Sequence, residues 1–75
     1  MIAVGKTVKI KKQYQADFDD FGDEELVVKD VATSSEEHKG YDESMEGMPL
    51  YTLKFKNEDF DFPYALYENT LELIQ

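Results

Sequence analysis

The chain has 75 residues and a formal net charge of −9, because seventeen Asp and Glu face eight lysines and no arginine. A chain of this length forms one domain, residues 1–75. There is no Cys, which excludes disulfides, thiolate metal sites and Cys nucleophiles. No stretch approaches the roughly 18 apolar residues of a membrane span, and the first residues do not form a signal peptide. We therefore expect a cytoplasmic protein that contacts no membrane.

The charge is also unevenly distributed. Residues 1–14 carry four lysines and no acid, whereas all seventeen acids lie in the rest of the chain. Direct nucleic-acid binding is disfavoured, because counterion release requires clustered cations. The absence of arginine further argues against a nucleotide-handling enzyme, since phosphate recognition favours the bidentate guanidinium group.

The first predicted strand is indicated by alternation. Val8 and Ile10 alternate with lysines, and Tyr14 keeps the same phase. This period of two is typical of a half-buried strand. Lys12 breaks the pattern, so we expect a bulge or a strand edge there. The next stretch, residues 15–25, contains six carboxylates and one glycine and is predicted to be an acidic loop.

A second strand is expected at residues 26–31, followed by a long loop at residues 32–49. Connections longer than roughly 12–15 residues are uncommon in compact domains and are usually functional or disordered. The remaining predicted elements are a strand at 50–56, a polar hairpin turn at 57–59, a strand at 60–62, one helical turn within 64–69 and a last strand at 71–74. Pro63 has no amide to donate and should end the fourth strand. A short C-terminal helix is the alternative for residues 64–74.

This order of elements resembles the SH3-like small barrel. The acidic loop would then be the RT loop, residues 32–49 the n-Src loop and residues 57–59 the distal loop. Pro63 stands where SH3 domains have the proline that opens their 3-10 turn. The resemblance implies an all-β fold, an SH3-like five-stranded small barrel with one short 3-10 or helical turn near the C-terminus.

The peptide-binding role of eukaryotic SH3 domains is not implied. Residues 65–69 read ALYEN and echo the ALYDY signature, but that signature precedes the RT loop and here it lies near the end. Proline-rich ligands dock on aromatic-lined grooves. The Trp used after the n-Src loop has no counterpart, since Leu50 and Tyr51 occupy that region. Small bacterial and phage proteins often use this barrel without binding such peptides.

The acidic loop partly matches a calcium loop. An EF-hand requires acids at positions 1, 3 and 5, glycine at 6 and a bidentate Glu at 12. Asp17, Asp19 and Gly22 fit this pattern, but Phe21 and Val28 replace two ligands. We expect no metal site here.

Two other interpretations of the acidic loop remain open. In the favoured one, Gly22 supplies the turn dihedral, Phe18 and Phe21 fold inward, and the acids face water. In the other, the acids steer a basic partner and an exposed Phe adds an apolar contact.

The long loop contains His38 among several acids. His38 has no visible nucleophile or orienting partner, and the loop serines lack a recognisable elbow. One His with loop carboxylates does not make a convergent metal site. We therefore predict no enzyme activity, no metal and no cofactor. Met45 or Met48 is expected to cover the barrel mouth.

The aromatic residues are expected to form the core, with aliphatic support. The predicted core comprises Tyr14, Val28, Leu53, Phe55, Phe60 or Phe62, and Leu66. Tyr51, Tyr64 and Tyr67 fit either a core or a rim position, because tyrosine is also enriched at interfaces.

The predicted function is non-catalytic binding of a protein partner, possibly basic, through the acidic loops. The candidate contact residues are Asp17, Asp19, Asp20, Phe21, Asp23, Tyr41, Asp42, Glu43, Tyr51 and Tyr64. The alternative is an acidic DNA-mimicking or enzyme-inhibiting protein of phage origin, whose carboxylates would occupy a basic groove. A third hypothesis is a subunit that pairs its sheet with a copy of itself.

Overall fold

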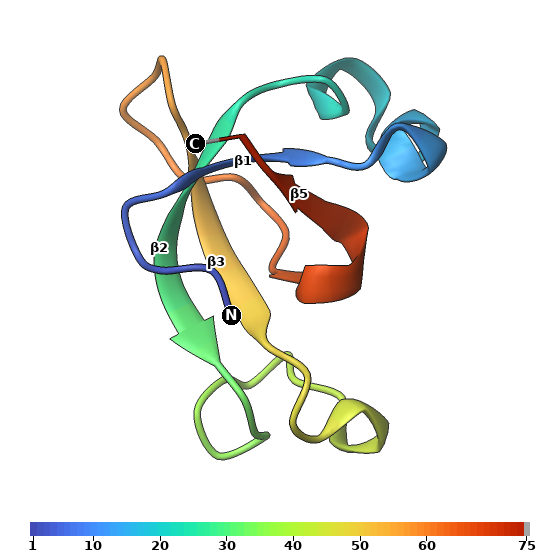
Figure 1. The fold of residues 1–75 in the computed structure, drawn as a ribbon, viewed down its shortest axis with the longest axis vertical. Helices are drawn as coiled ribbons and strands as arrows, with labels where there is room; N and C mark the ends of the chain where they lie inside the picture. The colour runs from blue at the N-terminus through green and yellow to red at the C-terminus, as the bar shows by residue number, and fades with distance from the viewer. Residues whose placement is uncertain (75) are drawn as a thin grey trace.

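The computed structural model describes residues 1–74, and of Asp19 only the backbone. Within that range the chain forms five strands in one antiparallel sheet (Figure 1). The strands are β1 (Thr7–Ile10), β2 (Leu26–Ala32), β3 (Leu50–Phe55), β4 (Leu66–Tyr67) and β5 (Leu71–Leu73). The predicted all-β class is confirmed. The sheet order is β4-β3-β2-β1-β5, so β4 and β5 lie at opposite edges and the sheet is not closed into a barrel.

The first strand is shorter than predicted. It ends at Ile10, and Tyr14 does not belong to it. The amide of Tyr14 donates to the carbonyl of Lys11 at 2.9 Å, and the side-chain amide of Gln15 donates to the carbonyl of Ile10 at 2.9 Å. These bonds turn the chain out of the sheet, so no bulge forms at Lys12. Tyr14 still packs against the core, from outside the strand.

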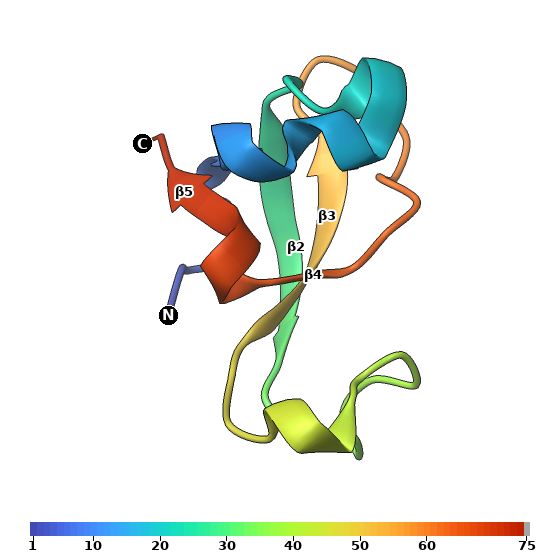
Figure 2. The same cartoon turned by 90° about the vertical axis from the view of Figure 1, so that its right-hand side faces the viewer.

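The predicted acidic loop is largely helical. Lys12–Phe21 forms a 3-10 helix, η1, which lies over one end of the sheet (Figure 2). Two single turns, η2 (Glu43–Met45) and η3 (Glu68–Thr70), follow later in the chain. The predicted helical turn is η3, which directly precedes β5.

The central pair β2 and β3 confirms two predicted strands to within one residue at their ends. Their register runs from Leu26 opposite Phe55 to Ala32 opposite Leu50. It shifts between Val28 and Asp30, so Lys29 is a bulge residue. Lys29 and Asp30 are consequently both exposed, which breaks the alternation that a regular strand would show.

The predicted fourth strand at residues 60–62 is reduced to an isolated bridge between Asp61 and Lys54, and β4 lies instead in the segment predicted to be a helical turn. After the hairpin, Phe62 donates its amide to Leu53 at 3.0 Å, and Phe60 accepts from the amide of Phe55 at 3.1 Å. The chain then leaves the sheet at Pro63 and rejoins it as β4, opposite the start of β3. Proline at this point costs no ladder hydrogen bond, as expected.

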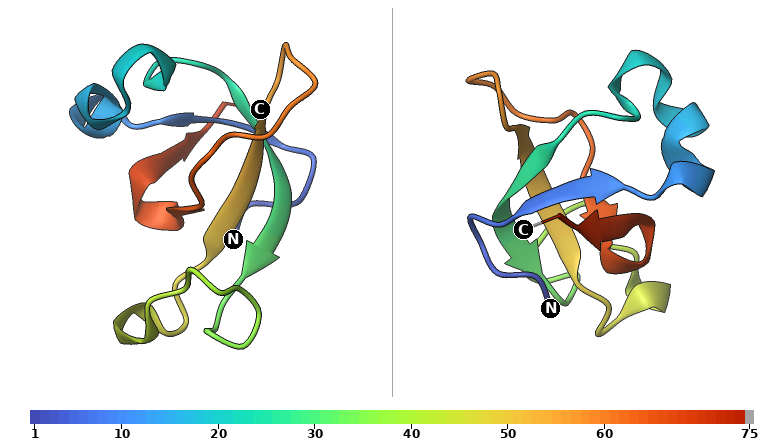
Figure 3. Two further views of the ribbon diagram at one scale, coloured as in Figure 1. Left: turned by 180° about the vertical axis from the view of Figure 1, so that it is seen from behind. Right: turned by 45° about the horizontal axis from the view of Figure 1, so that its top comes forward.

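The sheet is curved (Figure 3). The core comprises Val8, Ile10, Leu26, Val28, Tyr51, Leu53, Phe55, Phe62, Leu66 and Leu71. Of the two candidates in the fourth strand, Phe62 is the buried one, at 4% exposed. A second, smaller cluster of Ala32, Tyr41 and Leu50 packs with Met45, Ala65 and Tyr67 under the long loop. Met45 thus packs against this second cluster and does not cover a barrel mouth, because the sheet is not closed.

Tyr51 holds the N-terminal segment against the sheet. Its ring is fully buried, and its hydroxyl donates to Oε1 of Glu68 at 2.6 Å. The amide of Ile2 donates to the hydroxyl oxygen of Tyr51 at 2.7 Å. Burial, together with the bond to Glu68, raises the pKa of Tyr51 to about 12. The hydroxyl is thus a protonated bridge between two segments distant in sequence.

Replacing Tyr51 by Phe tests this bridge. We expect Tyr51→Phe to lower the free energy of unfolding at neutral pH by about 1–2 kcal/mol, because the Ile2 amide and the Glu68 carboxylate lose their partner. The folded-state pKa lies above the unfolded value, so the contribution of Tyr51 is complete below pH ~10 and is lost as the pH rises toward ~12. Urea unfolding should show the gap between wild type and variant closing over that range. A gap independent of pH would contradict the assignment.

Candidate functional site

Three aromatic side chains remain exposed where η1 meets the segment after β3. Phe21, Phe60 and Tyr64 are 44%, 56% and 55% exposed. We call these three rings the aromatic surface. Single exposed apolar residues are normal, but grouped aromatic rings mark interaction sites more often.

The aromatic surface rests on three further rings, those of Phe18, Phe55 and Phe62. The ring of Phe55 lies 5.5 Å from Phe21, 5.3 Å from Phe60 and 5.5 Å from Phe62, measured between ring centroids. The ring of Phe62 lies 5.9 Å from Phe18 and 5.8 Å from Tyr64. Phe18 and Tyr64 are 5.7 Å apart. Most pairs meet edge to face, which aromatic quadrupoles favour. The six rings form one connected array, so the exposed ones are held in place by buried ones.

A bend in η1 brings its aromatic residues onto the sheet. A straight 3-10 helix rises about 2.0 Å per residue and would separate Gln15 from Gly22 by roughly 14 Å. Instead Gly22 lies against the backbone of Gln15, where a Cβ atom would overlap the Gln15 carbonyl. Gly22 does not have a positive φ, unlike Gly5 and Gly47. Glycine is required here for close approach and not for a turn dihedral, which corrects the prediction for Gly22.

The position of Phe21 also differs from the prediction. We expected Phe18 and Phe21 to fold inward, and Phe18 does pack against the core. Phe21 covers one edge of Phe55 but keeps nearly half of its surface in solvent. The bend in η1 places it at the rim because its neighbours Gly22 and Asp23 turn back toward Gln15.

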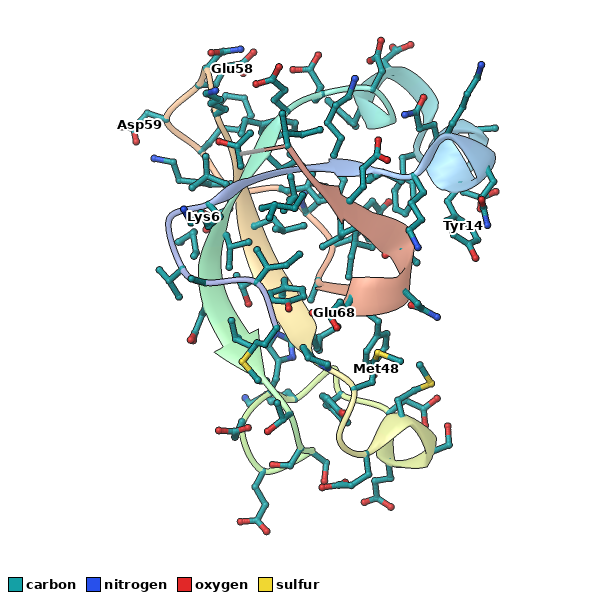
Figure 4. The ribbon with its side chains drawn as sticks, in the orientation of Figure 1. Lys6, Tyr14, Met48, Glu58, Asp59 and Glu68 are labelled. Atoms are coloured by element: carbon teal, nitrogen blue, oxygen red, sulfur yellow. The ribbon has the colours of Figure 1, made fainter. Side chains whose placement is uncertain are left out.

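Exposed carboxylates are adjacent to several of these rings in sequence. Asp17 and Asp20 flank the aromatic residues of η1, and Glu58 and Asp59 project from the hairpin before Phe60 (Figure 4). Asp23 joins Asp20 beside an open hollow lined also by Gln15, Ala16 and Gly22. The side chain of Asp19 lies outside the described part of the structure.

Two nearby carboxylates are already paired within the chain. Lys29 Nζ lies 2.8 Å from Asp61 Oδ1, and Lys56 Nζ lies 3.1 Å from Glu25 Oε1. A third ion pair among the described side chains joins the N-terminal amine to Glu68. Asp17, Asp20 and Asp59 therefore have no cation partner among the side chains that the structure describes.

The other predicted contact residues lie elsewhere. Asp42 and Glu43 belong to the long loop at the opposite end of the sheet (Figure 1). Asp42 caps η2, and its hydrogen bonding to Ser44, chiefly to the backbone amide, lowers the pKa of the Asp42 carboxyl. Tyr41 is 6% exposed and Tyr51 fully buried, so both rings build the domain and offer no face to a partner.

The long loop has its own internal support. The hydroxyl of Tyr41 lies 2.6 Å from the carbonyls of Met45 and Met48, and burial raises the Tyr41 pKa. Nδ1 of His38 accepts from the amide of Gly40 at 2.9 Å. His38 therefore has a local structural role within the turn that precedes Tyr41.

Comparison with known proteins supplies no relative. No family model, curated protein or solved structure matches this chain. Among residues 1–18 and 20–74, no group of three or more His, Asp or Glu side chains is arranged to hold a metal ion. The same residues include no helix that is long and apolar enough to cross a membrane.

Sequence reasoning missed Phe60 as a surface residue. Phe60 and Phe62 have the same parity, so alternation assigns them to the same face of a strand. Only the structure shows that Phe60 lies beyond the end of the regular pairing, where the hairpin projects past the core. The cluster of turn-forming polar residues immediately before Phe60 was the available signal.

Proposed function

We propose that this protein is a non-catalytic module that binds a protein partner through the aromatic surface. The observation that carries the proposal is that Phe21, Phe60 and Tyr64 stay in solvent although each is fixed against a buried ring. An aromatic side chain can bury 150–250 Å². Rings held rigidly lose little entropy on binding, which makes them effective anchors.

The fold assignment that accompanies this proposal is SH3-like. Its support is the element order, with a long excursion after β1, a hairpin after β3 and a 3-10 turn immediately before β5. The excursion carries Phe21, the hairpin carries Phe60 and the segment after Pro63 carries Tyr64; connecting segments of this kind often carry binding residues.

Site-specific photo-crosslinking tests the function. A photoreactive phenylalanine analogue at position 60 or 64 should capture a discrete partner from a lysate of the source cells. The same analogue at position 43, which is exposed at the other end of the domain, is the matched control and should capture none. Adding Phe21→Ser should abolish capture at position 60 while leaving the fold intact.

Two outcomes would count against the proposal. Capture at position 43 alone would move the binding surface to the long loop, where Asp42 and Glu43 were predicted contacts. Capture of a DNA-binding enzyme that DNA displaces would favour the DNA-mimic alternative instead.

A further inference from the structure

We propose that the occupant of the aromatic surface is a basic protein segment, whose Lys or Arg side chains lie on the exposed rings and pair with the neighbouring carboxylates. This inference rests on the proposed function and adds the chemistry of the partner. The proposed occupant is a cationic protein segment, and not an apolar segment or a second copy of this chain.

Among the described residues, part of the negative charge next to the rings in sequence is unpaired. Lys29 and Lys56 already neutralise Asp61 and Glu25 at the base of the hairpin. Asp17, Asp20 and Asp59, each adjacent in sequence to a ring of the array, have no such partner among the described residues. A partner that covers the rings also displaces water from these carboxylates.

Desolvation then decides between partner chemistries. Removing water from a carboxylate without a compensating charge or hydrogen bond is strongly unfavourable. A purely apolar partner would incur that penalty beside each ring it covers. A basic segment avoids it, because each cation replaces the water that the carboxylate loses.

The exposed rings provide the second argument. The face of Phe or Tyr attracts a cation within about 6 Å of the ring centroid, and Arg is the most frequent partner. The methylene groups of Lys and Arg can cover apolar surface while the charged group reaches a carboxylate. Phe60 directly follows Asp59 in the hairpin, so one Lys or Arg can stack on the ring and pair with that carboxylate.

The rest of the molecule supports a separate basic partner. Lys6, Lys9 and Lys11 belong to or flank β1 and Lys12 begins η1, but the whole chain carries a net charge of −9. Two copies repel each other at long range, whereas a cationic segment is attracted and steered toward the acidic end.

The test uses a defined probe and two charge-matched variants. The probe is a short peptide of alternating Arg and Leu, compared with peptides of alternating Glu and Leu and of alternating Ser and Leu. One variant combines Asp17→Asn, Asp20→Asn and Asp59→Asn. The control combines Glu36→Gln, Glu43→Gln and Glu46→Gln in the long loop, so both variants lose three negative charges.

Amide chemical shifts and dissociation constants are then measured by NMR titration. We expect the Arg-Leu peptide to shift residues 17–23 and 58–64, and the Asp variant to weaken binding at least about five-fold. The control variant should change the dissociation constant less than about two-fold. Raising NaCl from about 50 mM to about 500 mM should weaken the wild-type complex. The Ser-Leu and Glu-Leu peptides should bind more weakly than the Arg-Leu peptide.

Other results would contradict the inference, the proposed function or both. Equal weakening by the two variants would mean that net charge alone attracts the peptide, which overturns the inference. If Phe60→Ser weakens binding while the Asp variant does not, the surface takes an apolar segment; the proposed function then stands and the inference fails. If neither Phe60→Ser nor the Asp variant weakens binding, the proposed function and the inference both fail. Self-association seen by sedimentation and abolished by Phe60→Ser would assign the surface to a second copy.

Discussion

Truncating Phe62 to Ala is expected to lower the free energy of unfolding by about 3–5 kcal/mol. Phe62 is buried and meets three rings, those of Phe18, Phe55 and Tyr64, at centroid distances of 5.5–5.9 Å. Removing it leaves a cavity in the middle of the array, and the surrounding backbone of β3 and η1 cannot collapse onto it. A small domain has only about 5–15 kcal/mol of stability, so the variant should be largely unfolded at physiological temperature.

Phe60→Ala is the matched control, because it removes the same atoms two positions away. Phe60 is more than half exposed and meets one ring, so we expect a loss below about 1 kcal/mol. Phe62→Leu provides a milder core change if Phe62→Ala does not fold, with a loss of about 1–2 kcal/mol. Chemical denaturation followed by circular dichroism measures all three. Equal losses for the two Ala variants would mean that Phe60 is also buried and would remove it from the aromatic surface.

Gly22→Ala is expected to cost about 2–3 kcal/mol, which is large for adding one methyl group. A Cβ at this position overlaps the carbonyl carbon and oxygen of Gln15. That neighbour is backbone and cannot rotate away, so η1 must open and carry Phe18 and Phe21 off the sheet. Amide shifts of residues 15–23 should move together with the loss of stability.

Gly40→Ala and Gly22→Asn test whether glycine is needed at position 22 for close approach to the Gln15 backbone or for a positive φ. Gly40→Ala meets only the imidazole ring of His38, which can rotate, so its cost should stay below about 1 kcal/mol. Gly22→Asn is informative because Asn tolerates a left-handed conformation better than other residues. We expect Gly22→Asn to destabilise at least as much as Gly22→Ala. Rescue by Asn would show that a positive φ was the true requirement.

Element order and the regular strands were predictable from local patterns. Alternation at Val8, Ile10, Leu53 and Phe55 placed these side chains on the buried face, since side chains in a strand alternate with a period of two. The hairpin after β3 was predictable from its three polar residues. These features depend on neighbours in sequence, which is why composition and spacing were sufficient.

The helical character of residues 12–21 was not predictable in the same way. Its six aromatic, amide and aliphatic positions are interrupted by aspartates, which favour turns as readily as helix. The segment is held by contacts distant in sequence, such as Phe18 with Phe62 and Phe21 with Phe55. The same is true of the bulge at Lys29, which only its pairing with β3 reveals.

The class of the fold was predictable from local sequence, because strict alternation of apolar and polar residues favours a strand with one buried face. The sequence also determined the acidic character of the molecule and the absence of thiol chemistry. Only the tertiary structure decided which aromatic side chains stay in solvent. Exposure depends on where the sheet ends and on how closely η1 returns to it, and both are set by contacts between residues far apart in the chain.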